Sequence, residues 1–525
     1  MKLLHRKILL GFALSAALAC HAQSTDSVAS PADYALLPVR HVWLQTTNPV
    51  AYEAVDGSRM NTEFLFYYSN GDYKHLTDPE SPRGGIVSFE GFKQVNKLHF
   101  YGSFSYDIAK LEGQRWNDVL MPSPGNPFLL GDSIGGDYNN ELFEIKGAVA
   151  SSFSDRLKWG VSARYKGGSS ANQNDPRPLI NAVRYSISPG ILYDFSPWAV
   201  GLDIGYEGYN EFISISSVET NLNHSFFIFQ GLGNYFARIG TGYSRRYKGS
   251  AWNGNIQLNW RNNQTENILQ IGYRNMAENS EDGVAKPTAE GRATSNPFKS
   301  GDYQETTYSV LNILAVKNGQ TTHLATLRAA YLPSKGTWYD QREIIDSNQQ
   351  TIWEIYNQSV KYKDNTTTVG LAYTWQKEKN GFNDYLLGAS ADFDNHETTL
   401  YPDMQQQKYS NLAVALRGEK TFWLPKQFQL GVSAGLTYRM NLAASADFAG
   451  ITLAGLWSQS VYEYLTSDHY GGVARVKLSK RMRLGKLPSI VYWIAGIDYT
   501  RSTLETESFD QADRMNLTTS IGFTF

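Results

Sequence analysis

The 525-residue chain has a single cysteine, Cys20, and no long apolar run after its N-terminal segment. Because Cys20 lies in a segment that we expect to be removed, the mature protein would have neither a disulfide framework nor thiol chemistry. No stretch of the remaining chain approaches the roughly 20 consecutive apolar residues that a membrane-spanning helix requires. A helical membrane protein is therefore excluded.

The chain also lacks an excess of either charge and any recognisable metal or nucleotide motif. The 48 Lys and Arg residues nearly balance the 50 Asp and Glu residues, which gives no reason to expect nucleic acid as a partner. Two of the nine histidines lie in the N-terminal segment, and the others show no spacing typical of metal ligands. No glycine loop of the phosphate-binding type is present. We expect no metal and no cofactor.

The N-terminus has the layout of a cleaved secretory signal. Lys2, Arg6 and Lys7 precede the apolar run "ILLGFALSAALA", which small residues follow. We expect cleavage between Ala22 and Gln23. In an alternative interpretation Cys20 would be an acylated lipoprotein cysteine, but the preceding leucine lies one position too close for the usual Leu-x-x-Cys order.

The stretch "WNGNIQLNW" shows the alternation that dominates the rest of the chain. Trp252, Ile256, Leu258 and Trp260 fall on one face of a strand, and asparagine and glutamine occupy the other. The two tryptophans are about 26 Å apart along a strand at ~3.3 Å per residue. This spacing approximates that of the two interfacial aromatic girdles of a membrane barrel.

Further segments repeat this pattern, and the apolar face of each has an aromatic residue at both ends. Trp159 and Tyr165 are one such pair, and Trp198 and Tyr206 are another. A β-sandwich would also alternate, but its strands typically have about 5 or 6 residues. These segments have the greater length expected of tilted membrane strands. Since every backbone polar group in lipid needs a partner, such a sheet must close on itself. We predict an all-β fold, a transmembrane antiparallel up-and-down β-barrel.

The connections predict 18 to 20 strands. Tight turns are expected at 94–97, 154–156, 196–198, 262–265, 317–320 and 424–427. Long loops are expected near 108–139, 168–182, 211–224, 276–302, 333–350, 395–408 and 443–469. The alternation of short and long connections slips once between residues 332 and 408, so either Thr351–Tyr362 belongs to an extracellular excursion or one strand is missing from the count. We divide the chain into a signal peptide (1–22), an N-terminal periplasmic or hatch segment (23–60) and the barrel (61–525).

The last eleven residues, "MNLTTSIGFTF", form one further alternating strand that ends the chain on an aromatic ring. Ile521, Phe523 and Phe525 share its apolar face. The pattern resembles the C-terminal signal of outer-membrane barrels, which implies recognition by the barrel-assembly machinery. It also implies contact with outer-membrane lipid and lipopolysaccharide of a Gram-negative bacterium. With short turns in the periplasm, both termini would be periplasmic.

The segment before the first strand, "TNPVAYEAVDGSRMNTEFLFYY", resembles the start of the long-chain fatty-acid transporter (FadL-type) barrels. In that family an Asn-Pro-Ala motif lies in an N-terminal hatch; Asn48, Pro49 and Ala51 match it, and Val50 departs from it. The alternative is a plain turn before the first strand. The segment is too short for the plug domain of TonB-dependent receptors. Over its full length the chain resembles an outer-membrane β-barrel family of unassigned function.

The segment "GGVARVKLSKRMRLGK" predicts a ladder of cations that faces the lumen. Arg475, Lys477, Arg481 and Arg483 share one face of this strand. They could attract anionic solutes, as rings of charge do in pores. Alternatively, they could pair with carboxylates that are also predicted to face inward, such as Asp203, Glu207, Asp392, Glu419 and Asp498.

One fragment, "FLLGDSIGG", resembles the nucleophile block of the GDSL-type esterases, with Ser133 as the nucleophile. Such a serine needs a histidine and an acid, but neither Asp394 with His396 nor Asp468 with His469 has the spacing of that family. We therefore do not expect an enzyme.

The sequence instead predicts a porin-like or ligand-specific channel for uptake of a small solute. In the alternative, a barrel that transports nothing would use its long extracellular loops to bind an envelope receptor or lipoprotein in an uptake complex.

Overall fold

The computed structural model describes residues 33–219, 221, 223–283, 297–345, 347, 349, 351–485, 487–506 and 508–525. The expected signal peptide, with Cys20 and the cleavage site at Ala22 and Gln23, lies outside the described residues. Within the described ranges, no helix combines the length and the apolar character that crossing a membrane requires.

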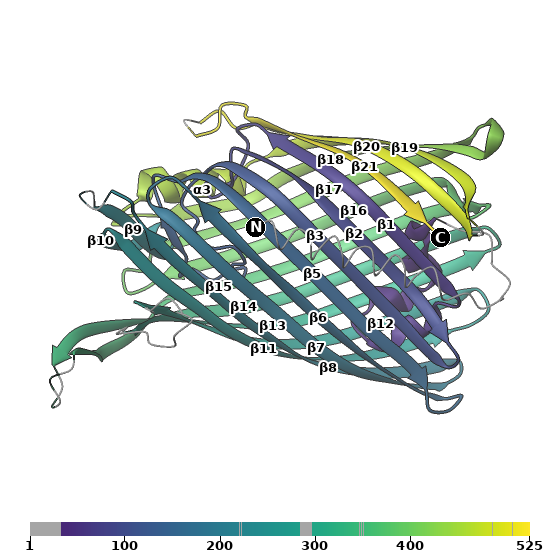
Figure 1. Ribbon diagram of the computed structural model, residues 1–525, viewed down its shortest axis with the longest axis horizontal. Helices are drawn as coiled ribbons and strands as arrows, with labels where there is room; N and C mark the ends of the chain where they lie inside the picture. Colours follow the sequence, from purple (N-terminus) through teal and green to yellow (C-terminus); the bar gives the residue numbers. More distant parts are fainter. Residues whose placement is uncertain are drawn as a thin grey trace.

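Eighteen antiparallel strands form one closed sheet, which confirms the predicted barrel (Figure 1). Its strands are β1 (Ser58–Asn70), β2 (Ser81–Val95), β3 (Leu98–Gln114), β5 (Gly136–Ser152), β6 (Leu157–Asn172), β7 (Arg177–Phe195), β8 (Trp198–Ser216), β11 (Gly242–Arg261), β12 (Thr265–Asp282), β13 (Phe298–Asn318), β14 (Thr321–Ile345), β15 (Thr351–Lys379), β16 (Phe382–Leu400), β17 (Gln406–Trp423), β18 (Phe428–Asp447), β19 (His469–Leu484), β20 (Leu487–Ser502) and β21 (Asp513–Thr524). Each barrel strand pairs with its neighbours in chain order, and β21 returns to β1.

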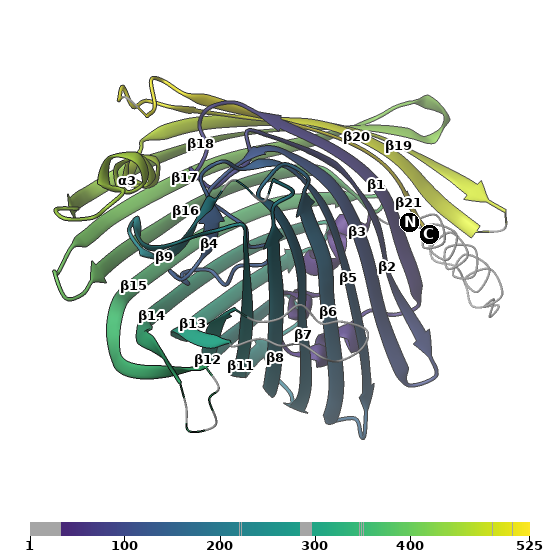
Figure 2. The ribbon, with the colours of Figure 1, turned by 60° about the vertical axis from the view of Figure 1, so that its left-hand side comes forward.

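The remaining elements belong to the connections and to the segment before β1. Inside the barrel lie η1 (Tyr34–Leu36), α2 (Leu37–Arg40), η2 (Val42–Gln45) and η3 (Pro49–Ala54), and the connections contain η4 (Pro425–Gln427), η5 (Ala454–Gln459) and α3 (Ser460–Thr466) (Figure 2). A second, three-stranded sheet consists of β4 (Leu130–Asp132), β9 (His224–Gly231) and β10 (Asn234–Gly240). We call the barrel end with the longer connections the loop end and the opposite end the turn end.

The positions of the turns explain why the predicted alternation of short and long connections was interrupted once. The sequence analysis missed the tight turn between β15 and β16, where Asn380 and Gly381 have φ values of 50° and 75°. Asn-Gly is a strong hairpin signal because both residues tolerate positive φ. Thr351–Tyr362 forms the outer part of the 29-residue strand β15, so it is the excursion rather than a separate membrane strand.

Several connections that were expected to be long loops are mostly strand. β6 and β7 are joined by four residues, 173–176, and β16 and β17 by five, 401–405, while β14 continues to Ile345. The predictions at 168–182, 333–350 and 395–408 were wrong because the strands continue beyond the apolar part of their outward face. There the alternation that marked them in the sequence is lost.

The outward face of the barrel is an apolar band between two aromatic levels. On β8, Leu202 and Ile204 are 43% and 52% exposed, whereas the inward Asp203 between them is 2% exposed. Trp198 pairs in register with Trp260 near the turn end, and Tyr206 pairs with Trp252 eight residues further along β8. Trp159 and Tyr165 lie on β6, six residues apart and on the face opposite the buried Gly160. The fold thus places the residues predicted for the girdles at two heights of the wall.

The C-terminal strand closes the barrel. Its register on β1 runs from Asn61 opposite Thr524 to Asn70 opposite Met515. The last residue takes part, because the amide of Met60 donates to the carbonyl of Phe525 at 2.6 Å and the amide of Phe525 donates back at 2.9 Å. Ile521 points outward and is 51% exposed. The alternation of this strand therefore leaves no open sheet edge.

A cation in the apolar band should destabilise the barrel. We expect Leu202→Arg to lower the free energy of unfolding by about 2–4 kcal/mol, the cost of an arginine on the lipid face near the bilayer midplane. Urea unfolding of the protein in phospholipid vesicles measures this change. Val218→Arg, which changes a 64% exposed residue in the connection after β8, is the control and should have little effect. Equal stability of both variants would contradict the assignment of this face to lipid.

Candidate functional site in the barrel lumen

Residues 33–57, which we call the lumenal segment, lie inside the barrel at the turn end (Figure 2). Val42, Trp43, Val50 and Ala51 are buried against inward-facing wall residues of several strands, among them Leu192, Ala199, Ile268, Ile313 and Ala315. Fully burying a side chain such as valine stabilises by about 1.5–3 kcal/mol. This apolar contact holds the segment against one side of the wall.

The centre of the contact is Asn48, the first residue of the predicted hatch motif, which is 1% exposed. Its amide nitrogen donates to the side-chain oxygen of Gln257 at 3.0 Å and to the carbonyl of Ile191 at 3.1 Å. Its Oδ1 accepts from the amide of Val50 at 3.0 Å and so caps η3, which begins at Pro49. Asn48 therefore joins the local structure of the segment to the wall.

Three glycines of the wall make room for this motif. A Cβ atom at Gly190 would lie 2.5 Å from Oδ1 of Asn48, and one at Gly160 would lie 2.7 Å from the carbonyl carbon of Pro49. A Cβ atom at Gly201 would lie 3.0 Å from the side-chain nitrogen of Asn48. These glycines lie on the adjacent strands β6, β7 and β8, and Gly160 pairs directly with Gly190. Because they have no side chains, these three glycines let the backbone of the lumenal segment lie directly against the wall. We call them the glycine seat.

Ion pairs attach the lumenal segment to other sides of the barrel. Asp33 pairs with Lys477 at 2.5 Å, Arg40 pairs with Glu378, and Glu53 pairs with Lys158 at 2.5 Å. Partly exposed pairs of this kind contribute only about 0–1 kcal/mol each. The buried apolar and amide contacts around Asn48 therefore hold the segment more strongly than its salt bridges.

The predicted basic ladder lies on β19, and most of it has protein partners. Lys477 binds Asp33, and Arg475 lies 3.8 Å from Asp498, one of the carboxylates considered in the sequence analysis. Arg481 donates to the carbonyl of Asn380 and lies over the ring of Phe382 at 4.9 Å. Arg483 is exposed near the turn end. This arrangement corresponds to the pairing alternative, with the lumenal segment as a partner that the sequence analysis did not foresee.

Residues 115–135, which we call the inner loop, fold into the lumen nearer the loop end. Glu211, on β8 and fully buried, accepts from the amides of Leu120 and Met121 at 2.7 and 2.9 Å. Glu278, on β12, accepts from Oγ of Ser123 at 2.5 Å. Two carboxylates of the wall therefore hold the inner loop at its centre.

A buried ion pair fixes the end of the inner loop. Arg245 and Asp282 are both fully buried and lie 3.1 Å apart, and Arg245 also donates to the carbonyl of Phe128 at 3.0 Å. Tyr247 donates to the same carbonyl at 2.9 Å. Removing either partner of such a pair would leave an uncompensated buried charge, which costs about 3–5 kcal/mol. The inner loop is thus a packed element of the lumen.

Within the inner loop, the carboxyl of Asp118 is also buried. Burial raises the pKa of Asp118 well above its usual range, and the nearby Asp132 raises it further. The hydroxyl of Tyr138 donates to Oδ1 of Asp118 at 2.5 Å. A raised pKa in the folded state means that the carboxyl contributes stability at low pH, which is lost as the pH rises.

The lumenal segment and the barrel wall from β5 to β13 line a cavity of about 440 Å³, which we call the chamber. Most of its wall residues carry a charged, amide or hydroxyl group, and they come from β5 to β13: Lys146, Ser162, Arg164, Ser188, Asp203, Asn253, Asn255, Tyr273, Arg274, Thr307 and Ser309. The lumenal segment contributes Leu44, Thr46, Thr47, Asn48, Ala51 and Tyr52. The residues of the hatch motif therefore bound the same space as the polar wall.

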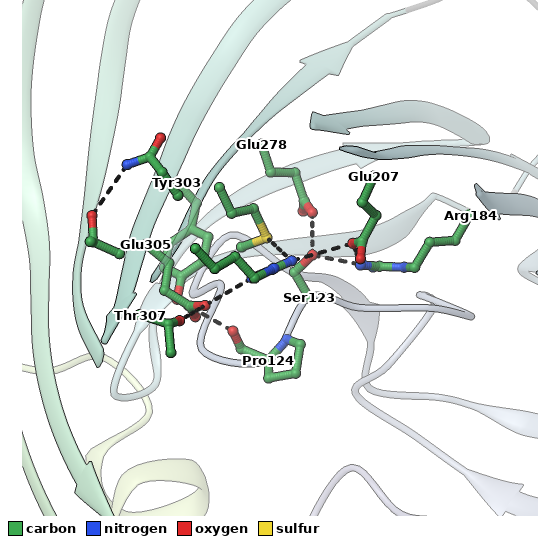
Figure 3. Close-up of polar contacts among 12 residues, drawn as sticks. Ser123, Pro124, Arg184, Glu207, Glu278, Tyr303, Glu305 and Thr307 are labelled. Atoms are coloured by element: carbon green, nitrogen blue, oxygen red, sulfur yellow. Dashed lines mark hydrogen bonds and ion pairs between the residues drawn. The ribbon is translucent and has the colours of Figure 1, made fainter. Parts of the chain in front are cut away.

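A chain of ion pairs joins inward-facing side chains of β7, β8, β12 and β13 (Figure 3). Arg184 pairs with Glu207 at 2.7 Å, and Glu207 also lies 3.3 Å from Arg274. Arg274 in turn pairs with Glu305 at 3.2 Å. Arg184 also lies 3.3 Å from Oγ of Ser123 in the inner loop. The charges of these four side chains compensate one another within the chain.

The structure assembles no hydrolase site around the residues that resembled one. Ser133 is exposed in the inner loop, next to Asp132, whose Oδ1 accepts from the amides of Ile134 and Gly135. His396 contacts Thr366 on β15 at 2.8 Å, and His469 contacts Tyr73 in the connection between β1 and β2 at 2.8 Å, so both histidines have partners away from Ser133. Across the described part of the chain, no three His, Cys, Asp or Glu side chains are grouped so that they could hold a metal ion.

Sequence reasoning singled out Asn48, Pro49 and Ala51, which the structure places in the lumen, but missed the chamber. Its residues come from seven strands and the lumenal segment, and no single stretch carries a motif for them. The available signal was the inward alternation of each strand, which already identified Asp203 as an inward-facing residue.

The closed strands, the apolar band and the polar lumen define a β-barrel of the outer-membrane type. Over residues 49–525 the sequence matches the family described as "Family of unknown function (DUF6850)", and the chain belongs to that family. No curated protein sequence matches the chain.

Solved structures with similar chain traces include outer-membrane proteins of several kinds. A FadL homologue of Pseudomonas aeruginosa is 11% identical, with a TM-score of 0.35, over 94% of this chain and 96% of that one. The outer-membrane transporter YddB of Escherichia coli is 8% identical, with a TM-score of 0.40, over 88% and 80% of the two chains. The copper transporter OprC is 8% identical, with a TM-score of 0.41, over 89% and 80%.

The glycine seat predicts how the lumenal segment can be loosened. We expect Gly190→Ala to displace the segment, because the new Cβ atom would meet Asn48 at 2.5 Å and Pro49 at 2.8 Å. The only natural cysteine is Cys20, so a cysteine introduced at the buried Ala51 can report on exposure. Maleimide labelling of Ala51→Cys should be at least several-fold faster in the presence of Gly190→Ala.

Gly431→Ala is the matched control, because its Cβ atom would meet only ordinary contacts of 3.6 Å or more. It should leave the labelling rate of Ala51→Cys unchanged. Equal rates in both glycine variants would show that the seat does not hold the segment.

Proposed function

We propose that the protein is an outer-membrane channel that admits a small hydrophilic solute through the chamber. The observation that carries this proposal is the cavity of about 440 Å³ that the lumenal segment and the polar side chains of the wall line together. Barrels of 16 to 18 strands are wide enough to leave an aqueous lumen. In this protein two separate elements occupy that lumen and would restrict passage to solutes that fit between them.

The chamber lining supports a hydrophilic solute. Most lining side chains carry a hydroxyl, amide or charged group, and the apolar part comes from Leu44, Ala51 and the rings of Tyr52 and Tyr273. A long-chain fatty acid, which the resemblance of the hatch motif implies, would need a mainly apolar pocket, because ligand sites for apolar molecules are lined by apolar side chains. We therefore favour a polar route along the lumen over a hydrophobic route through the wall.

Passage would need no covalent chemistry. A solute that enters from the loop end would pass the inner loop and reach the chamber. It would leave at the turn end after the lumenal segment had shifted from its seat. The segment is held by non-covalent contacts that can break and re-form, chiefly the buried contacts around Asn48. With the short turns in the periplasm, this direction corresponds to uptake.

Swelling of liposomes in arabinose tests the channel. We expect Asn48→Ala to admit arabinose several-fold faster than the unmodified protein, because the segment loses its Asn48 hydrogen bonds to Ile191, Leu202 and Gln257 of the wall and its η3 cap. Asn357→Ala is the control, since the Asn357 amide donates to Asp340 in the protruding part of β14 and β15, away from the lumenal segment. Swelling no faster than that of empty liposomes for all three proteins would falsify the channel proposal.

A second candidate is a partner-binding surface at the loop end. β14 and β15 have 25 and 29 residues, the longest strands of the barrel, and their outer parts extend beyond the rest of the loop end (Figure 1). Their outer parts expose apolar side chains, with Ile345 73% and Tyr356 63% exposed. Exposed apolar groups of this kind occur where proteins meet. We propose that an envelope receptor or lipoprotein would bind this hairpin.

The two candidates are separable by co-purification. If the hairpin binds a partner, Tyr356→Asp should remove a stoichiometric companion that the unmodified protein retains after mild detergent extraction. Val218→Asp, a comparably exposed apolar residue elsewhere at the loop end, should retain it. Absence of any stoichiometric companion of the unmodified protein would count against this second candidate.

A further inference from the structure

Two cations face each other across adjacent strands in the wall of the chamber. Lys146 on β5 pairs in register with Arg164 on β6, and both side chains line the cavity. Side chains directly opposite in an antiparallel sheet have Cβ atoms only about 4.5–5.5 Å apart, and like charges in this position are destabilising. The wall therefore maintains an unfavourable pair at a place that a solute can reach.

The two cations have different partners: Arg164 binds a carboxylate, and Lys146 lies over aromatic rings. Arg164 makes two hydrogen bonds to the carboxylate of Glu144, at 2.9 and 2.7 Å. Lys146 lies over the rings of Tyr52 and Tyr101, at 5.5 and 5.4 Å from their centroids. Among the residues with described side chains, Lys146 has no salt bridge to a carboxylate. Its charge is stabilised by aromatic faces, which a ligand could supplement.

The groups next to this pair are hydrogen-bond donors. Ser162 and Ser188 also line the chamber, and they pair directly across β6 and β7, two residues from Arg164 along β6. The one carboxylate of the chamber lining, Asp203, is already engaged. It accepts from Asn255 at 2.8 Å, from Gln257 at 2.6 Å and from Thr47 of the lumenal segment at 2.8 Å. The exposed chemistry on this side of the chamber is therefore cationic and hydroxylic.

We propose that Lys146, Arg164, Ser162 and Ser188 form a subsite for an oxyanion, the carboxylate or phosphate group of a small solute. The proposal rests on the proposed function, because it assigns a chemical class to the solute of the chamber. An oxyanion between the two cations would convert their repulsion into two charge-assisted hydrogen bonds, and the serine hydroxyls would bind its remaining oxygens. The site is distinct from the ladder on β19, where Lys477 is occupied by Asp33.

Calorimetric titration of the detergent-solubilised protein with inorganic phosphate, and separately with succinate, tests the subsite. We expect Lys146→Gln and Arg164→Gln each to raise the Kd of the bound anion at least about tenfold, since hydrogen bonds to charged groups contribute about 1.5–3 kcal/mol. Lys146→Arg should restore most of the affinity. Arg417→Gln is the matched control, because Arg417 bonds Thr374 on another part of the wall and is not part of the chamber lining. It should leave the Kd unchanged.

Each outcome decides the proposal. Binding of neither phosphate nor succinate to the unmodified protein, or an equal loss of binding in Arg417→Gln and the chamber variants, overturns it. Should Lys146→Gln fail to fold, Arg164→Gln carries the same comparison. Arabinose swelling with no anion binding would reject the subsite and leave the channel intact. Anion binding without any arabinose swelling would retain the subsite and reject the channel.

Discussion

Closure of the sheet is the constraint on which the rest of this structure depends. A lipid-facing strand cannot leave a backbone N–H or C=O unpaired, so eighteen strands pair in chain order and β21 returns to β1. The last residue, Phe525, still exchanges hydrogen bonds with Met60. Closure forces one face of every strand toward lipid and the other toward a lumen too wide for wall side chains to fill.

The chain fills this lumen from both ends with its own polypeptide. The lumenal segment and the inner loop cover polar wall residues, so each must satisfy the groups that it buries. Asn48 does so for the segment, and Glu211 and Glu278 accept from the inner loop. The chamber lies between the lumenal segment and the wall from β5 to β13. Near it, Arg184, Glu207, Arg274 and Glu305 compensate one another, whereas Lys146 contacts aromatic rings and has no carboxylate partner among the described residues.

Much of the fold was predictable because barrel strands carry a local signal. Period-two alternation, aromatic ends and tight turns identified the barrel and a strand number in the correct range. The slip in the count arose at Asn380 and Gly381, a turn signal that was present but not used. Loop lengths were less predictable, since polar strand extensions at the loop end do not alternate apolar with polar residues. The site was predictable only in part, because contact across the lumen has no counterpart in sequence spacing.

The sequence by itself determined that the chain is a membrane β-barrel, because the period of a strand and its closing edge are local properties of consecutive residues. It also marked Asn48 and Pro49 as unusual. Only the tertiary structure decided that these residues rest on Gly160 and Gly190, that Lys477 binds Asp33, and that Lys146 meets Arg164 across a chamber. The physical reason is that strand register and barrel closure bring together side chains from distant parts of the chain, and their charges acquire partners only in that arrangement.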